Sequence, residues 1–319
     1  MYDKFYLAPN LKIKNMKKLL KPILLSLLAI VIVLASVVVY FATDLFASSP
    51  QAGEFKNIPV LQKSEDSVMK IQFIRHATLL ITVENKKILV DPMLGDIGTE
   101  SPYPLTANRV KNPLIPLPVE KNSLIKNVDA VLLTHYHPDH FDREAENILA
   151  KGMLIYCQPG TDKMLKSKGF TNVQVIEDKV EFGNISISRS YVNHGEGIWL
   201  EPMGKSSSFY IETKNESLFI TGDAVFDELL ESSLKEIKPK IIIANAGAAQ
   251  FIIGNPITLT ADALKSIARL LPDTKIIADH MNTINHCKLT KDKLKEFIVE
   301  EKLTKNIFIP DEGDILSLN

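Results

Sequence analysis

Three histidines and one aspartate lie within six positions in the stretch VLLTHYHPDHFD, residues 131–142 of a chain that has only seven histidines. The apolar run that leads into this stretch is typical of a buried β-strand. His135 and His137 would point to the same side of such a strand, because side chains alternate with a period of two. Asp139 and His140 follow the strand, where a turn can bring them to a second position beside the first pair.

This arrangement of residues suits a metal ion. Zinc is commonly bound by imidazole nitrogen and carboxylate oxygen at about 2.0–2.2 Å, and the loops after a strand can leave a coordination position open. A solvated turn is the alternative interpretation of clustered His and Asp residues. The buried character of VLLT and the density of the His-x-His-x-Asp-His pattern favour a metal site at the edge of a β-sheet.

Strands and helices alternate through most of the chain after residue 68. Short apolar or alternating runs predict strands, among them MKIQFI, TLLITVE, KKILVD, MLIYC, SSFYIET, ESLFITGD, KIIIANA and KIIADH. Apolar residues at helical spacing predict helices at FDREAENILA, TDKMLKSKG, TADALKSIARLLP and TKDKLKEFIVEEKL, with Thr260 as an N-cap. Two β-then-α halves indicate an α/β fold with the helices outside and the sheets inside.

The motif THYHPDH resembles the metal motif of the metallo-β-lactamase superfamily. Members of that family also have a histidine at the end of a later strand, an aspartate in a Gly-Asp pair, and a last histidine near the C-terminus. His194, Asp223 and His280 occupy these places in SRSYVNHGEG, SLFITGDAV and KIIADH. The resemblance covers about residues 69–311 and implies a four-layer αβ/βα sandwich with the metal ions at one edge of the two sheets.

The resemblance also implies two zinc ions per chain, with iron or manganese as alternatives that bind similar donors. The implied ligands are His135, His137 and His194 for the first ion, Asp139, His140 and His280 for the second, and Asp223 between the two. A pair of ions a few Å apart would polarise a substrate and lower the pKa of bound water to about 7. Asp139 is also a candidate catalytic residue that orients this water.

His76 and His286 are further candidate catalytic residues. His76 lies in IRHATLLI and precedes the Asp91-Pro92 pair, a pattern similar to the branch that contains L-ascorbate-6-phosphate lactonases and N-acyl-phosphatidylethanolamine-hydrolysing phospholipase D. In that branch the histidine and the aspartate lie near the metal edge. This chain departs from the pattern, since Arg75 replaces a glycine and Gly-Asp-Ala-Val replaces Gly-Asp-Thr-Gly. A structural role is the alternative for His76 and Asp91.

His286, only six residues after His280, has two interpretations: it orients the substrate, or it replaces His280 as the last metal ligand. We favour His280 as the ligand because it directly ends a strand. Residues 92–123 form a proline-rich segment, of which 92–118 is expected to line a substrate groove. The loop NAGAAQF (245–251) follows a strand and has two interpretations, a border of the pocket or a turn of small residues. Trp199 also has two, a place in the groove lining or packing against its neighbours, and we favour packing.

A run of 20 residues near the N-terminus, Ile23–Ala42, contains no charge. An α-helix rises about 1.5 Å per residue, so this run matches the roughly 30 Å hydrocarbon core of a bilayer. We therefore predict a transmembrane anchor at 22–43. Residues 1–21 contain six lysines and one acid, which predicts a basic cytoplasmic N-terminus and a single-pass topology with the body outside the cytoplasm. A cleaved signal peptide, which would leave a secreted protein, is the alternative.

The remaining chain is predicted to comprise a linker, residues 44–67, and a hydrolase domain, residues 68–319. Residues 22–319 carry 31 basic and 37 acidic side chains, a balance that argues against nucleic acid as a partner. The sequence thus predicts a membrane-anchored, zinc-dependent hydrolase that activates water against an ester, lactone or phosphodiester bond of a small molecule or a lipid. The alternatives are a β-lactamase or lactonase for soluble substrates, and a non-catalytic metal-binding envelope protein.

Overall fold

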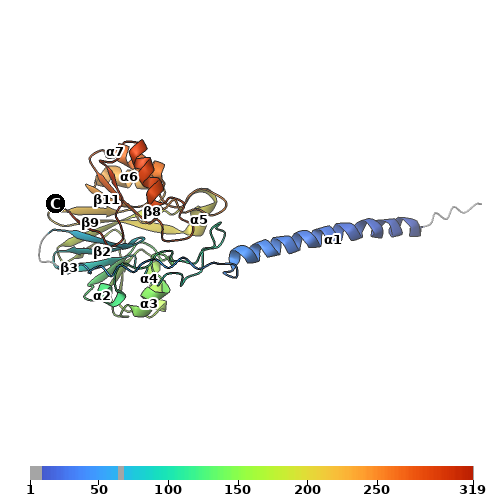
Figure 1. Cartoon of the computed structure of the whole chain (residues 1–319), viewed down its shortest axis with the longest axis horizontal. Helices are drawn as coiled ribbons and strands as arrows, with labels where there is room; N and C mark the ends of the chain where they lie inside the picture. The colour runs from blue at the N-terminus through green and yellow to red at the C-terminus, as the bar shows by residue number, and fades with distance from the viewer. Residues whose placement is uncertain (1–8, 64–67, 319) are drawn as a thin grey trace, which may run out of the picture. The chain divides into compact units, whose positions relative to one another are not determined.

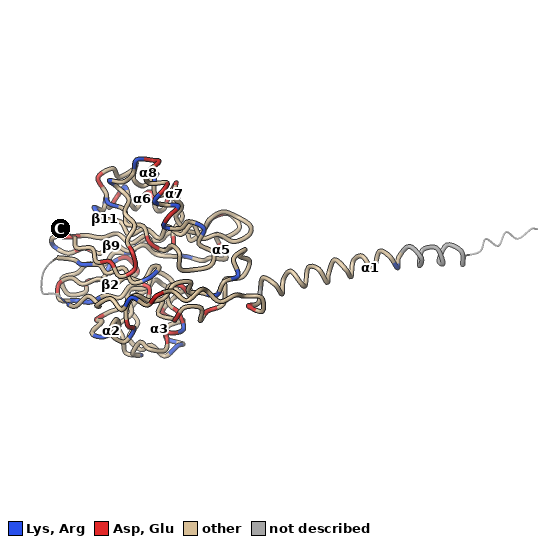
Figure 2. Tube along the Cα trace, viewed as in Figure 1, with Lys and Arg blue, Asp and Glu red and all other residues tan. Residues whose placement is uncertain are grey.

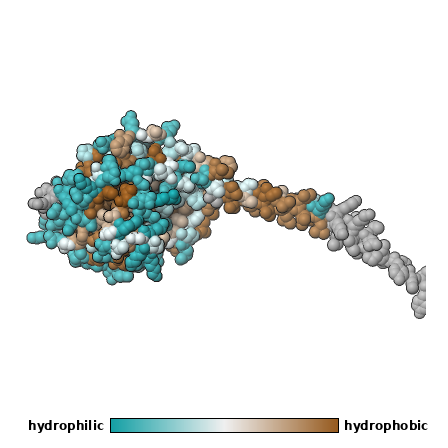
Figure 3. Space-filling view, turned by 90° about the horizontal axis from the view of Figure 1, so that it is seen from below, coloured by the Kyte–Doolittle hydropathy of each residue, from teal (hydrophilic) through white to brown (hydrophobic). Residues whose placement is uncertain are grey.

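The computed structural model describes residues 9–63 and 68–318, in two compact units, Met1–Phe46 and Ala47–Asn319. The first unit contains helix α1 (Pro9–Ala42; Figure 1), within which Leu20–Phe41 is long and apolar enough to cross a membrane. The trace of α1 carries no charge after Lys21 (Figure 2), and its described surface is mostly hydrophobic (Figure 3).

This helix agrees with the predicted span at residues 22–43. An apolar helix near the N-terminus can also belong to a signal sequence, so the single-pass topology and the side of the membrane stay predictions. Residues 1–8 of the predicted cytoplasmic segment lie outside the described residues.

The second unit is built on two seven-stranded sheets. The first sheet has the order β14 (Ile315–Ser317), β1 (Lys70–Arg75), β2 (Thr78–Val83), β3 (Lys86–Val90), β4 (Ala130–Leu133), β5 (Ile155–Cys157) and β6 (Val173–Val175). The second sheet has the order β13 (Ile307–Phe308), β12 (Lys275–Asp279), β11 (Ile241–Asn245), β10 (Ser217–Ile220), β9 (Lys205–Glu212), β8 (Ile185–Asn193) and β7 (Lys179–Phe182). Strands β3 to β6 and β10 to β13 are parallel neighbours, so the loops after their carboxyl ends share one edge.

Apolar side chains form three packed layers around these sheets. One layer lies between the sheets and includes Ile81, Ile187 and Phe209. The outer face of the first sheet is covered by α2 (Lys121–Ile125), α3 (Arg143–Ile148) and α4 (Thr161–Ser167), and that of the second by α6 (Glu228–Ile237), α7 (Ala261–Leu270) and α8 (Lys291–Glu300). These layers are built from residues 58–318. The four-layer αβ/βα sandwich is therefore confirmed.

Local sequence signals explain where the outer helices begin. The Thr260 hydroxyl oxygen accepts a hydrogen bond from the Ala263 N–H at 3.2 Å, which confirms the predicted N-cap of α7. Helix α6 was not among the predicted elements, although its signals are present in the sequence. Asp227 caps its N-terminus, and Leu230 and Leu234, four residues apart, are buried on one face.

Residues 47–63 differ from the predicted linker because they lie against the body. Ser48 forms an isolated parallel bridge with Val110, and the Ile58 N–H donates to the Pro118 carbonyl at 2.7 Å. The Ile58 side chain also packs on the apolar layer under the helices of the first sheet. The compact unit accordingly includes this segment, which apolar burial holds in place.

Candidate metal centre

Strand ends bring the predicted ligands together from both sheets. The THYHPDH motif follows β4 of the first sheet, and His76 lies in the turn between β1 and β2. His194, Asp223 and His280 follow β8, β10 and β12 of the second sheet. These side chains meet at one edge of the sandwich, in groups whose nitrogen and oxygen atoms lie within 4.8 Å of one another.

The first group consists of His135, His137 and His194. His137 Nδ1 lies 3.0 Å from His135 Nε2 and 3.2 Å from His194 Nε2. Nitrogen atoms bound at about 2.0 Å to a tetrahedral ion would lie about 3.3 Å apart. The observed separations therefore fit three ligands of one zinc ion.

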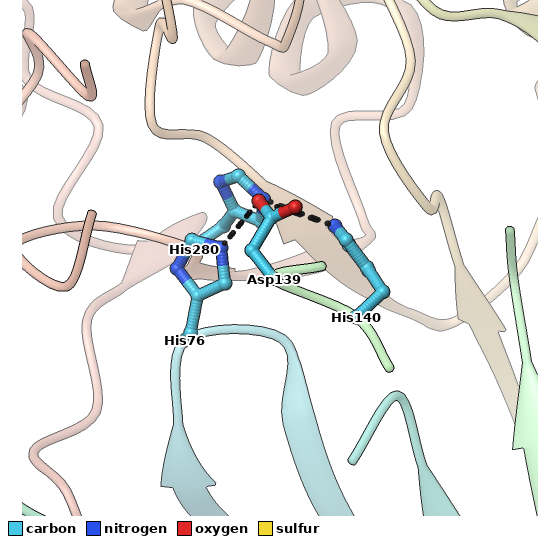
Figure 4. A group of neighbouring side chains, drawn as sticks. All are labelled: His76, Asp139, His140 and His280. Atoms are coloured by element: carbon cyan, nitrogen blue, oxygen red, sulfur yellow. Dashed lines mark hydrogen bonds and ion pairs between the residues drawn. The ribbon is translucent and has the colours of Figure 1, made fainter. Parts of the chain in front are cut away.

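The second group consists of four buried residues, His76, Asp139, His140 and His280 (Figure 4). His280 Nε2 lies 3.3 Å from His140 Nε2 and 3.6 Å from Asp139 Oδ2, and the same carboxylate oxygen lies 3.1 Å from His76 Nε2. Three of these residues are the predicted ligands of the second ion. His76 was predicted as a catalytic residue near the metal edge, and its Nε2 atom lies within the ligand group itself.

Asp223 lies between the two groups. Its Oδ2 atom is 3.5 Å from His194 Nε2 in the first group and 3.3 Å from His140 Nε2 in the second. Its Oδ1 atom is 3.1 Å from His280 Nε2 and accepts a hydrogen bond from Asn245 Nδ2 at 2.8 Å. This position is suitable for a carboxylate that bridges two ions, as predicted for Asp223.

Burial keeps most of the imidazoles neutral at pH 7. It lowers the pKa of His76 to about 3 and that of His137 to about 4, with further lowering by neighbouring histidines. The pKa values of His135 and His194 are also lowered, chiefly by burial. Neutral imidazole is the form that binds a metal ion, so these four side chains are in the protonation state that a metal site requires.

The carboxylates carry the negative charge of the site. Burial alone would raise the pKa of Asp139 and Asp223, but the neighbouring histidines outweigh it and hold both pKa values well below the usual range. Burial alone would lower the pKa of His140, but Asp223, Asp91 and Asp139 raise it well above its usual value. A divalent cation would displace the His140 proton, and the three buried carboxylates would balance the positive charge of the ion.

A second set of hydrogen bonds orients the ligands. Asp91, which was predicted to lie near the metal edge, accepts hydrogen bonds from His140 Nδ1 at 2.8 Å and from the Thr134 N–H and hydroxyl at 2.8 and 2.7 Å. His194 Nδ1 donates to the Ile257 carbonyl at 2.9 Å. Such partners fix which ring nitrogen faces the ion and raise its basicity.

Asp91→Asn is expected to weaken metal binding at the second group by about 10–100-fold, because His140 loses its charged acceptor. Competition with a chromophoric chelator measures this affinity. Asp129→Asn is the matched control, because Asp129 bonds to Lys63 and to the Lys87 N–H away from the site. An unchanged affinity in Asp91→Asn would show that Asp91 does not support the metal centre.

Unusual backbone conformations occur at the site. His76, Asp91 and His280 have φ values of 60°, 42° and 64°, in the left-handed region that residues other than glycine rarely adopt. Gly222, which precedes Asp223, has φ 58°, and a Cβ atom there would lie 2.4 Å from the Ser207 carbonyl oxygen. The Gly-Asp pair therefore requires glycine, and such strain is typical of functional sites.

A cavity of about 270 Å³ lies beside Asp139. Its lining residues are Met93, Glu100, Ser101, Pro102, Tyr103, Pro104, Asn112, Pro138, Asp139 and Ile284. Most of them belong to the proline-rich segment, which borders the pocket as predicted. The lining is largely apolar, and its charged members are both acidic.

Arg75, which stands where the related branch has glycine, fixes this segment. Its buried guanidinium donates to the carbonyl oxygens of Met93 at 2.8 Å, Gly95 at 2.9 Å and Ile115 at 3.1 Å. Burial lowers the pKa of Arg75 to about 10, so the group stays charged at neutral pH. The departure from the family pattern thus ties the pocket segment to β1.

Tyr103 was not predicted, because it lies in an irregular segment without a motif. Its hydroxyl donates to Asp139 Oδ1 at 2.6 Å, and its ring centroid lies 4.4 Å from that of His286. The His286 ring also lies 5.6 Å from the Phe251 ring, in the loop 245–251. His286 lies outside the ligand groups, whereas His280 lies within one, so the geometry favours His280 as the last ligand.

Comparison with known proteins gives one family match, a beta-lactamase superfamily domain at residues 70–278. The UPF0173 protein YddR of Bacillus subtilis is 34% identical over 250 residues, which cover 77% of this chain and 98% of that protein. The structure of isothiocyanate hydrolase from Delia radicum gut bacteria is 33% identical, with a TM-score of 0.75 over 78% of this chain and 99% of that one. A possible metal-dependent hydrolase from Veillonella parvula is 29% identical, with a TM-score of 0.76 over 79% and 100% of the two chains.

Proposed function

Because this chain belongs to the beta-lactamase superfamily and its relatives include metal-dependent hydrolases, we propose that it is a hydrolase with two zinc ions per chain that cleaves a small, neutral, largely apolar substrate. The observation that carries the proposal is the pair of ligand groups with Asp223 between them, beside an apolar cavity. A non-catalytic envelope protein would have no need for a substrate-sized cavity against the ligand Asp139.

The residues have separable roles in this proposal. The first ion would be held by His135, His137 and His194, the second by Asp139, His140 and His280 with His76 beside them, and both by Asp223. The two ions would polarise the substrate and lower the pKa of the attacking water. Asp139 lines the cavity, and hydrogen bonds from Tyr103 and His76 hold its carboxylate, so it would orient that water.

We favour an isothiocyanate, the substrate named for a relative that is 33% identical, over a phosphodiester. The cavity lining contains Glu100 and Asp139 as its charged members and has no lysine or arginine among the residues that form it. Apart from the two proposed ions, this lining offers a phosphate no positive charge, whereas phosphate sites usually carry Arg or Lys. The neutral group R–N=C=S would take up one water: a C–O bond forms at its central carbon, the C–N bond breaks, and protonated nitrogen leaves as R–NH₂ with carbonyl sulfide.

The test is hydrolysis by the zinc-loaded second unit, residues 47–319, whose apolar layers do not include α1. Benzyl isothiocyanate, p-nitrophenyl acetate and bis(p-nitrophenyl) phosphate would be compared at equal concentration, with amine or nitrophenol release as the readout. We expect kcat/KM for the isothiocyanate to be the highest of the three. A preference for the phosphodiester would contradict the proposed substrate class, and inactivity of the metal-loaded protein on all three would support the non-catalytic alternative.

Tyr103→Phe is expected to lower kcat/KM for the preferred substrate about 10-fold, because a hydrogen bond to a charged group contributes about 1.5–3 kcal/mol, only part of which acts on the reaction. Metal content should stay the same, since Tyr103 is not a ligand. Tyr210→Phe is a control, because its hydroxyl faces the exposed Glu212 away from the site. A loss of metal in Tyr103→Phe would assign the residue to metal retention instead.

We further propose that α1 is an uncleaved anchor that places the body outside the cytoplasm. The apolar length of Leu20–Phe41 and the lysines that precede it support this topology. N-terminal sequencing of the membrane fraction tests it: an intact N-terminus is expected, and a protein that starts after residue 43 would identify a signal peptide. Protease treatment of intact cells should then degrade the body and spare residues 1–21.

A further inference from the structure

Three loops at the metal edge expose large apolar side chains. The turns η1 (Gly197–Trp199) and α5 (Leu200–Met203) follow β8, the loop 250–256 follows β11, and residue 105 belongs to the proline-rich segment. The exposed side chains are Leu105 (44% exposed), Ile198 (59%), Leu200 (38%), Ile252 (49%) and Ile253 (59%). We call these five residues the edge patch.

Hydrogen bonds join the loops into one surface. The Ile252 N–H donates to the Leu105 carbonyl at 2.9 Å, and Trp199 Nε1 donates to the Ile253 carbonyl at 2.7 Å. The Trp199 ring lies 4.3 Å from that of Phe251, which is buried beneath the patch, and α5 lies at one end of the second sheet (Figure 1). A contiguous apolar surface on loops that hydrogen bonds hold together is typical of an interaction site.

The chain enters the body beside this patch. The Ser48 N–H donates to the Arg109 carbonyl at 3.0 Å, and the Ser48 carbonyl accepts from the Lys111 N–H at 2.8 Å. Ser48 is therefore fixed on the segment that also carries Leu105. Only residues 43–47 separate it from Ala42, where α1 ends. An extended chain spans at most about 3.6 Å per residue, so the six steps from Ala42 to Ser48 span at most about 22 Å.

We propose that the edge patch docks on the surface of the membrane that α1 spans, so that the metal edge and its cavity face the lipid. The short tether brings the patch to the bilayer, where exposed aliphatic side chains bury in the headgroup–acyl boundary. Trp199, with an apolar ring and a hydrogen-bonded Nε1, is a residue type that favours this boundary. The inference rests on the proposed anchor and not on the proposed substrate. An apolar substrate dissolved in the bilayer would reach the cavity directly.

Trp199 is the only tryptophan of the chain and reports on the docking by its fluorescence. The zinc-loaded full chain would be reconstituted in phosphatidylcholine vesicles with or without brominated acyl chains. We expect brominated lipid to quench Trp199. Ile252→Ser with Ile253→Ser should relieve this quenching although α1 remains inserted, and should weaken the binding of the second unit alone to vesicles about 10–30-fold.

The matched control is Leu229→Ser with Val299→Ser, which changes two exposed apolar residues on α6 and α8. This pair should leave the quenching unchanged. Unquenched Trp199 in the wild-type chain, or equal relief by both pairs, would overturn the proposal. One further outcome would also overturn the proposal: Trp199 is unquenched in vesicles, and the protein forms a dimer in solution that Ile252→Ser with Ile253→Ser dissociates. The patch would then bind a second copy of the chain. Isothiocyanate hydrolysis in detergent should be equal in all variants, and its absence would count against the proposed function alone.

Discussion

Asp223→Ala is expected to remove most of the bound metal and to reduce kcat/KM by more than about 10³-fold, because loss of a single electrostatic contact at a reacting centre already costs about 10²–10³-fold. Its carboxylate approaches His194 in the first ligand group and His140 and His280 in the second. Removal of this one residue therefore weakens both ions at once. Elemental analysis should find less than one metal ion per chain, against two in the wild-type protein.

The control for this substitution is Asp273→Ala, which removes an exposed carboxylate. It should retain full metal content and activity. Circular dichroism should show that Asp223→Ala keeps its fold, since the three apolar layers do not include Asp223. Two tightly bound ions in folded Asp223→Ala would contradict the bridging role.

Removal of the metal is expected to destabilise the second unit without unfolding it. Without the ions, three buried carboxylates share one protonated histidine, His140. A metal ion that binds only the folded state, at a free concentration of 1,000 times its Kd, stabilises that state by about 4 kcal/mol. In a chain of this size, each kcal/mol changes the Tm by about 2–4 °C. Differential scanning calorimetry should therefore show a Tm lower by roughly 10 °C after treatment with a chelator.

Zinc added back to the chelated protein should restore the original Tm. Asp223→Ala should show little difference between the chelated and the zinc-loaded samples, because it binds little metal in either. If the chelator leaves the Tm of the wild-type protein unchanged, the negative charge of the buried carboxylates is neutralised without a metal ion.

The sequence predicted those parts of the fold and site that depend on local pattern. Alternating apolar runs predicted helices outside and sheets inside, and histidines that directly end strands, as His280 does after β12, marked the metal edge. The four-layer sandwich and the division of the ligands between two ions came from the resemblance to the metallo-β-lactamase superfamily. Spacing alone left His286 open as a ligand. The structure separates the two because β12 directs His280 toward Asp223, whereas His286 packs beside Tyr103.

Contacts between segments that are far apart in the sequence could not be predicted from a sequence pattern. Tyr103, which reaches Asp139, lies in the proline-rich segment, where Arg75 binds three carbonyls and Asn285 accepts from the Tyr103 N–H. Arg75 itself was recognised only as a departure from the family pattern. The segment 47–63 has a linker-like composition, yet Ile58 is held against the body. Helix α6, by contrast, could have been predicted from the sequence, because Asp227 is a typical N-cap and Leu230 and Leu234 have helical spacing.

Anomalous X-ray diffraction from zinc-loaded crystals of the second unit, measured on both sides of the zinc absorption edge, tests the dinuclear centre most directly. We expect two anomalous peaks, one among His135, His137 and His194 and one among the second ligand group, with Asp223 adjacent to both. The change in anomalous signal across the zinc edge would show that both peaks are zinc. A single peak, or peaks away from these residues, would contradict the dinuclear centre on which the proposed function depends.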